Sequence, residues 1–222
     1  MSDDIVSILI KSTQETLYML GLSTFFALLF GIPIGIVLTV TEKGGIYPLP
    51  NLNKILAGII NTIRSVPEII LIVILLPLAR FIVGTTLGAD AAIVSISIGS
   101  APFIARIVES SLKEIDKGKI EAAQSMGATP LQIITKVLLP EALPSIVRGV
   151  TISIIGILGF TAIAGAIGAG GLGSMAIRFG YQRFRTDILI ATVIILIVIV
   201  QIIQLIGDGL SKHINKKRFK SN

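Results

Sequence analysis

The sequence carries little charge and no cysteine. Only 14% of its 222 residues are charged, against about 25% in a typical soluble domain. Its apolar fraction is 53% and its mean hydropathy is +0.90. So few charges cannot cover a water-facing surface, which excludes an ordinary soluble enzyme and a disordered chain. The lack of cysteine excludes a disulfide-stapled secreted domain and a cysteine zinc cluster. An integral membrane protein remains.

Five apolar segments are long enough, or nearly so, to cross a membrane. Three are free of charge over 20 to 29 residues, and a spanning helix needs about 20. Two are shorter: one contains Glu68 and Arg80, and the other is bounded by Asp90 and Arg106. Tilting, or end charges that reach the interface, would extend them. We expect one all-α integral membrane domain with spans at about 16–41, 67–83, 89–106, 149–171 and 187–207.

Lysine and arginine set the expected orientation, because they concentrate in cytoplasmic loops. Fourteen of the 19 lie in segments 42–66, 106–148 and 208–222. This places the N-terminus outside and the C-terminus in the cytoplasm, although three arginines within 178–185 oppose it locally. The basic tail 212–218 is expected to lie on anionic lipid. A nucleic-acid site there is not expected.

The segment between the third and fourth spans, about 109–145, is the one long polar loop. Residues 119–126 are good helix formers, and Gly127 is typical of a helix end. Thr129 then fits an N-cap, Pro130 the first helical position and Gln132 the third residue of a capping box.

This second helix is expected to run to Leu138, with Pro140 and Pro144 interrupting the approach to the next span. Two short helices joined by a tight turn form a compact unit. Such a unit can dock in a groove of a partner protein.

The loop carries a spaced motif that resembles the EAA loop of ABC-importer permeases. Val137 stands where isoleucine is usual in that family, which is a conservative change. Segments 61–67, 100–106 and 165–173 further resemble the methionine-importer permeases. The motif consists of Glu121, Ala122 and Ala123, then Gly127 after three residues, Val137 after nine more, and Leu139-Pro140.

The resemblance implies a multi-pass permease in a prokaryotic cell membrane that works by alternating access as a homodimer. Two separate ATPase subunits would each receive one 109–145 loop and use ATP and Mg, and an external binding (lipo)protein would deliver methionine. The chain itself would be no enzyme and bind no cofactor. D-methionine or other methionine derivatives, a methionine-containing dipeptide and another amino acid remain alternative substrates.

Two other classes of membrane protein fit the sequence less well. An ion-coupled secondary transporter should show paired broken helices in two halves, and five spans do not divide that way. A purely structural membrane protein would leave the docking loop unexplained.

Two groups of candidate site residues follow. By analogy with the family, the seven motif residues contact the ATPase; small alanines permit close approach, and Glu121 can accept charge-assisted bonds. Ionisable groups at membrane depth are often functional, so Arg64 and Glu68 are pathway or gate candidates, or else an interfacial pair. The remaining candidates are Ser100, Thr161 and Met175, for which helix packing is the alternative.

Two further features do not support nucleotide or metal chemistry. Gly168, Gly170 and Gly173 match G-x-G-x-x-G, but an apolar helix precedes them where a dinucleotide site needs a strand. They predict close helix packing or a hinge near the external face. No G-x-x-x-x-G-K-[ST] occurs, so ATP hydrolysis by that route needs another polypeptide, and His213 is the lone histidine.

Overall fold

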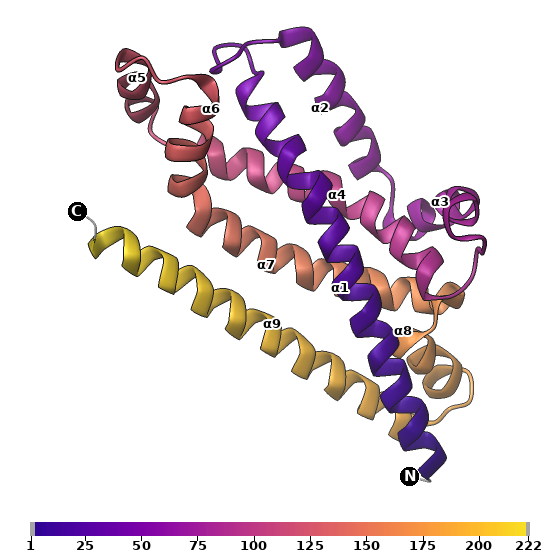
Figure 1. Cartoon of the computed structure of the whole chain (residues 1–222). Helices are drawn as coiled ribbons and strands as arrows, with labels where there is room; N and C mark the ends of the chain where they lie inside the picture. Colours follow the sequence, from indigo (N-terminus) through magenta and orange to yellow (C-terminus); the bar gives the residue numbers. More distant parts are fainter. Residues whose placement is uncertain (1–2, 221–222) are drawn as a thin grey trace.

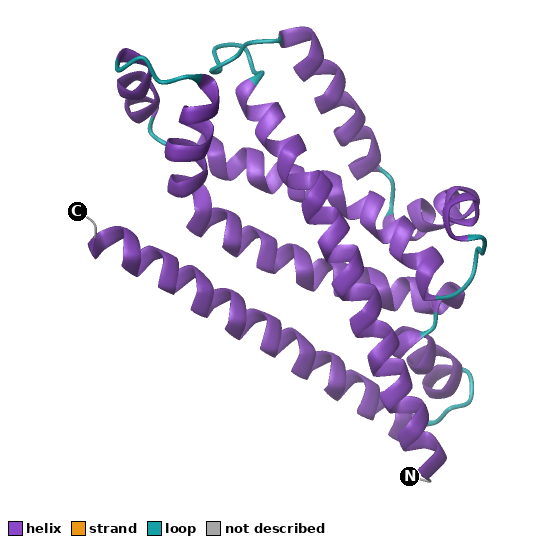
Figure 2. Cartoon of the chain, viewed as in Figure 1, coloured by secondary structure: helices purple, strands orange, loops and turns teal. Residues whose placement is uncertain are grey.

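The structure, a computed structural model, describes residues 3–220 of the backbone and the side chains of residues 5–215. All regular structure in this part is helical (Figure 2), as predicted. Three π-helical segments, Ile134–Leu138, Gly165–Ala169 and Ala176–Tyr181, lie between α-helices. The α-helices are α1 (Asp3–Val40), α2 (Pro50–Ser65), α3 (Glu68–Val83), α4 (Ala89–Lys113), α5 (Lys117–Ser125), α6 (Pro130–Ile133), α7 (Leu139–Ala164), α8 (Gly171–Met175) and α9 (Thr186–Lys220).

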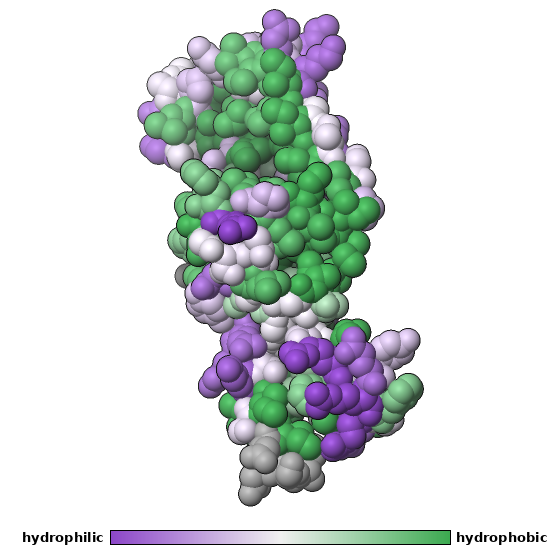
Figure 3. Space-filling model, turned by 90° about the vertical axis from the view of Figure 1, so that its right-hand side faces the viewer, coloured by the Kyte–Doolittle hydropathy of each residue, from purple (hydrophilic) through white to green (hydrophobic). Residues whose placement is uncertain are grey.

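Four of these helical stretches are long and apolar enough to cross a membrane. A fifth span results if α2 and α3, bent by 110°, count as one. Several helices extend beyond the predicted boundaries: α1 begins at Asp3 and α9 continues to Lys220. A helix does not have to end where its apolar run ends, because backbone hydrogen bonds continue into polar sequence. Figure 3 shows a broad hydrophobic area over the middle of one face, with hydrophilic residues gathered below it.

The helices form one bundle with two distinct ends (Figure 1). α5 and α6 lie at one end, which we call the α5 end, and the described C-terminus lies on that side. α8 and the described N-terminus lie at the opposite, α8 end. α1 crosses α4 and α7, while α9 runs beside α7.

Glycines allow the central helices to approach closely. A Cβ on Gly31 of α1 would lie 2.8 Å from the carbonyl oxygen of Ala101 in α4, and one on Gly35 would lie 2.5 Å from that of Ala105. α9 meets α7 in the same way, since a Cβ on Gly207 would lie 2.2 Å from Thr151 Oγ1. Small residues at helix crossings are the usual solution inside a membrane, where lipid removes the hydrophobic drive for association.

The break between α2 and α3 is explained by Pro67. Val66 has φ −85° and ψ 129°, an extended conformation, because the ring of a following proline disfavours the helical region. Pro67 precedes α3, which begins at Glu68, one residue after the predicted start. The chain therefore turns sharply here while both flanking segments stay helical.

The uncharged run 149–177 does not form one continuous helix. α7 ends at Ala164, short of the predicted end at residue 171, and Ile167 and Gly168 have non-helical angles. Gly168, Gly170 and Gly171 have φ of +108°, +88° and +74°, values that glycine adopts readily. Hydropathy identifies a long uncharged run but carries no information on backbone angles. The prediction of one unbroken span was therefore wrong at its C-terminal end.

Candidate functional site

The first half of the 109–145 loop folds as predicted. Asp116 caps α5 by accepting a hydrogen bond from the Gly118 N–H at 2.8 Å. α5 ends before Gly127, which has φ +79° and donates its N–H to the Gln124 carbonyl at 2.9 Å. Glycine reverses the chain here without the cost that a side chain would add in the left-handed region.

The predicted capping box at Thr129 is also present. The Thr129 hydroxyl accepts a bond from the Gln132 N–H at 3.4 Å, and the Gln132 side chain accepts one from the Thr129 N–H at 2.9 Å. Pro130 occupies the start of α6, where its missing N–H is harmless. These local bonds fix the direction in which the chain leaves the turn.

The second loop helix does not end at Leu138 as predicted. It passes through a π-helical turn, where the Leu139 N–H bonds the Ile134 carbonyl, and continues into α7. Pro140 and Pro144 both lie inside helix; Pro140 sits at the beginning of α7, where π-helical bonding replaces the regular ladder just before it. One continuous helical rod, from Pro130 to Ala164, therefore connects the loop to a span.

The tip of the loop exposes apolar side chains that the motif did not single out. Met126 is 81% exposed and Leu131 69% exposed, on either side of Gly127. Among the motif residues, Glu121, Ala122, Gly127 and Pro140 are exposed, Val137 and Leu139 are half-buried, and Ala123 is buried. Met126 directly before Gly127 and Leu131 directly after Pro130 place large apolar residues at both ends of the turn, and this was the signal that could have found the tip. Exposed apolar side chains on a polar segment indicate a binding surface.

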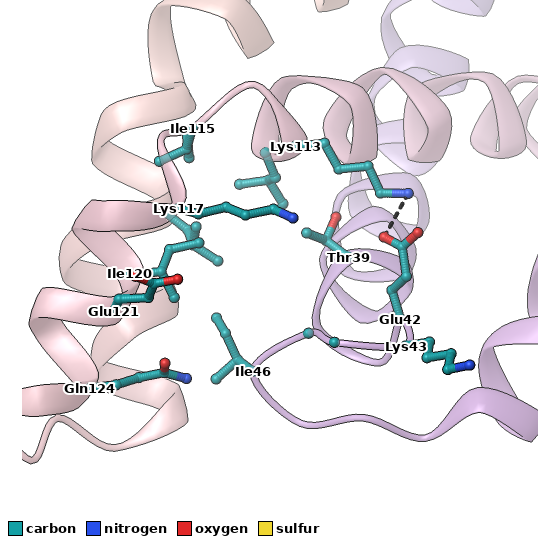
Figure 4. A pocket seen from close by; sticks show the side chains of 14 residues that line it. Thr39, Glu42, Lys43, Ile46, Lys113, Ile115, Lys117, Ile120, Glu121 and Gln124 are labelled. Atoms are coloured by element: carbon teal, nitrogen blue, oxygen red, sulfur yellow. Dashed lines mark ion pairs between the residues drawn. The ribbon is translucent and has the colours of Figure 1, made fainter.

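A cavity of about 420 Å³ separates α5 from the chain that links α1 to α2. Its lining includes Lys113, whose Nζ lies 2.8 Å from a Glu42 carboxylate oxygen and 2.9 Å from one of Glu109. Figure 4 shows Glu121 on the α5 side of the cavity, across from the Lys113–Glu42 ion pair. Within residues 5–215, Glu121 has no ion pair. Its carboxylate is free to accept bonds from a basic partner.

The five pathway candidates fall into two groups. Arg64 is exposed at the end of α2, and Glu68 is half-buried at the start of α3, so the structure brings both to the α2–α3 break. Ser100 and Thr161 are each 1% exposed and Met175 is 3% exposed. These three lie inside the chain, as packing residues do.

Arg64 has an aromatic neighbour that the sequence did not reveal. Its guanidinium carbon lies 4.9 Å from the centre of the Phe103 ring on α4, within the range of a cation–π contact. One turn further along α4, Arg106 donates to the Asn61 side-chain oxygen of α2 at 2.8 Å. The α2–α4 face therefore presents two arginines, of which Arg106 is ion-paired to Glu109 at 2.6 Å.

The glycine-rich turn at 165–171 is held by α1. Glu15 accepts a hydrogen bond from the Gly171 N–H at 2.7 Å, and Thr16 accepts one from the Leu172 N–H at 2.8 Å. A Cβ on Gly173 would lie 2.2 Å from the Ala162 carbonyl oxygen, so this segment packs directly on α7. The packing alternative for the glycines is confirmed.

Residues 5–215 contain no group of three or more histidine, cysteine or acidic residues that could hold a metal ion. His213 is exposed on α9. The side chains of Lys216, Lys217 and Arg218, which belong to the predicted lipid-facing tail, lie outside the described ones.

Comparisons with known proteins agree with this geometry. Residues 13–220 match the family described as "Binding-protein-dependent transport system inner membrane component". The chain is 48% identical to a probable D-methionine transport system permease protein MetI of Vibrio cholerae, covering 95% of this chain and 93% of that one. It is 46% identical to the methionine import system permease protein MetP of Bacillus subtilis, covering 93% of each.

Solved structures give the same result. A chain of the MetNI methionine ABC transporter, determined in inward-facing conformations, superposes with a TM-score of 0.94 at 43% identity, covering 96% of this chain and 99% of that chain. An amino acid ABC transporter superposes with a TM-score of 0.71 at 21% identity, covering 96% and 94%, and shows the shared fold alone. The resemblance expected from the EAA motif is confirmed.

Proposed function

Because the chain belongs to the family of binding-protein-dependent transport system inner membrane components, we propose that it is the permease subunit of an ATP-driven importer of methionine. It is a multi-pass membrane protein, and ATP is hydrolysed by a separate subunit. Relatives named for methionine or D-methionine transport, 46% and 48% identical over nearly their whole length, support the substrate. A methionine derivative, a methionine-containing dipeptide or another amino acid is the alternative.

The observation that carries the mechanism is the rod that joins the 109–145 loop to a span. α5, the Gly127 turn and α6 form a compact unit, and α6 continues into α7 without a break in the helix. Met126 and Leu131 at its tip would enter a groove of the ATPase, and Glu121 would bond a basic residue there. When ATP brings two ATPase subunits together, displacement of each loop would move α7 and switch the access of the pathway. Such coupling requires that each ligand favour one of two global states.

The proposed assembly has two permease copies, two ATPase subunits and an external binding (lipo)protein. The excess of lysine and arginine in the segments at the α5 end supports a cytoplasmic position for that end. The N-terminus would then lie outside. Arg64 and Glu68 would line the pathway at the α2–α3 break, whereas the burial of Ser100, Thr161 and Met175 favours a packing role for them.

Uptake of labelled L-methionine tests the function. Cells that lack their own methionine importers would carry this gene with its candidate ATPase and binding protein, beside an ATPase-dead control. ATP-dependent uptake that excess unlabelled methionine competes away is expected. No methionine uptake by an assembled complex would reject methionine, and uptake that follows an ion gradient without ATP would reject the ATP-driven class.

Two loop substitutions test the coupling. Gly127→Pro removes the Gln124 hydrogen bond and forces φ to about −65° where the turn needs +79°, and Glu121→Arg reverses the exposed carboxylate. Both should leave the permease in the membrane but release or uncouple the ATPase. Unchanged co-purification and unchanged uptake in both variants would refute the docking role.

A further inference from the structure

Arg64 lies beside the middle of α4, a helix long and apolar enough to cross a membrane. Its ring partner Phe103 is ten residues before Lys113, the last residue of α4. At 1.5 Å per residue that is about 15 Å from one end of a helix about 37 Å long. A guanidinium at this depth is costly against lipid and normally faces a water-filled path or a polar partner. Arg64 is exposed on the single chain and has no ion pair within residues 5–215.

Glu68 lies just beyond the break from Arg64. In a continuous helix this i, i+4 spacing would pair the two charges, but the 110° bend at Val66 and Pro67 separates the two helical segments. No salt bridge to Glu68 is present within residues 5–215. Four residues of chain place the two Cα atoms at most about 14 Å apart. Two charges of opposite sign thus flank the bend between α2 and α3, each without an ionic partner in the described part of the chain.

Phe103 completes the arrangement. Its ring is 41% exposed, although it also carries the Arg64 guanidinium 4.9 Å from its centre. With the cation near the ring, the uncovered ring surface remains available to a second group. Thioether sulfur atoms contact aromatic rings favourably, often at the edge.

We propose that Arg64, Phe103 and Glu68 form a substrate site for a zwitterionic thioether amino acid within the pathway, an inference that rests on the proposed function. Arg64 binds the α-carboxylate through charge-assisted hydrogen bonds. Glu68, the first residue of α3, binds the α-ammonium group. The Phe103 ring receives the thioether. The three groups match the three recognisable parts of methionine.

A second copy of the chain is the competing occupant, because its Glu68 could pair with Arg64 across the dimer. That pairing would leave the exposed ring of Phe103 without a role. Substrate occupancy and dimer pairing also predict different effects of added methionine, which makes them separable.

The cysteine-free sequence allows a direct test with a single introduced thiol. Ser65→Cys places the thiol beside Arg64, at an exposed position whose hydroxyl bonds only the Asn61 carbonyl of its own helix. The purified permease–ATPase complex without nucleotide would be treated with a hydrophilic thiol reagent. Labelling is expected, and L-methionine at ten times its dissociation constant should slow it about tenfold, as the free fraction falls.

Three controls make the test specific. Methioninamide, which lacks the carboxylate, should protect poorly. Arg64→Gln in the Ser65→Cys background should abolish protection by methionine while the ATPase still co-purifies. Tyr181→Cys, at a 71% exposed position outside the predicted spans, should label with no effect of methionine.

The outcomes decide the proposal independently of the uptake experiment. Labelling of Ser65→Cys without methionine protection, in a complex whose wild type imports methionine, would overturn the site and leave the transport function standing. Protection that survives Arg64→Gln would overturn the role of Arg64. A cross-link between the Ser65→Cys thiols of two copies, insensitive to methionine, would assign this face to the dimer instead.

Discussion

Two glycine turns, one at each end of the molecule, are built in opposite ways. At the α5 end, Gly127 has φ +79° and nothing within 4 Å of the place a Cβ would occupy. At the α8 end, Gly171 has φ +74°, and its Cβ would lie 2.6 Å from Thr16 Oγ1 and 3.0 Å from the Met19 methyl group. The first glycine supplies only a backbone conformation, and the second also supplies space for another helix.

The hydrogen bonds around the two turns also differ, because those at Gly127 are local and those at Gly171 reach another helix. Near Gly127, each bond joins residues no more than five positions apart, including the reciprocal capping box of Thr129 and Gln132. Near Gly171, the bonds from Glu15 and Thr16 span 156 residues. The turn at Gly127 is therefore held by bonds between near neighbours in the chain, while the turn at Gly171 is tied to α1.

The largest difference is expected from the same substitution at the two glycines. Gly171→Ala adds backbone strain of about 1–2 kcal/mol and overpacking of about 1–3 kcal/mol, because Thr16 and Met19 leave no room. Gly127→Ala adds the strain alone. The midpoint of thermal unfolding of the purified complex should fall clearly for Gly171→Ala and much less for Gly127→Ala. Equal shifts would show that the space around Gly171 is not limiting.

A smaller effect is expected at Glu15. Glu15→Ala leaves the Gly171 N–H without its acceptor, which costs about 1–2 kcal/mol for a partly buried group. Glu15→Gln keeps an acceptor oxygen and should recover most of this loss. Thermal unfolding of both variants measures the difference. If Glu15→Gln is as damaging as Glu15→Ala, the negative charge itself rather than the hydrogen bond holds the turn.

The smallest effect is expected at the local cap. Thr129→Ala removes the side-chain acceptor of the capping box and should cost about 1 kcal/mol of helix stability. Hydrogen exchange of the amides at 131–134 should accelerate roughly fivefold at that cost, with little change in the global unfolding midpoint. Thr129→Ser, which retains the hydroxyl, is the matched control. A global shift as large as that of Gly171→Ala would contradict the independence of this end.

The same contrast explains what the sequence could predict. The N-cap at Thr129 and the helix end before Gly127 rest on neighbours in the chain, so local signals predicted them. The helix break at 165–171 depends on Glu15 and Thr16, and hydropathy instead indicated one unbroken span. The continuation of α6 through Leu138 into α7 was missed because a π-helical turn leaves no simple sequence signal beside two prolines.

In the candidate pathway, too, the sequence did not reveal contacts between residues of different helices. Arg64 and Glu68 stood out because charge is rare in an apolar chain. The neighbour of Arg64, Phe103, comes from another helix and could be recognised only once α2 and α4 were seen together. The burial of Ser100, Thr161 and Met175 distinguishes them from the two charged candidates. The sequence alone could not make this distinction.

The long-range contact at Gly171 also has a consequence for the order of events during biosynthesis. The acceptors on Glu15 and Thr16 are made 156 residues before the N–H groups that they bind. At 5–20 residues per second, ribosomes need about 8–31 s to supply those donors. Until then the first helix enters the membrane with this carboxylate and hydroxyl unpaired to the turn. The α8 end can therefore close only when synthesis is nearly complete, whereas the 109–145 loop can fold as soon as it leaves the ribosome.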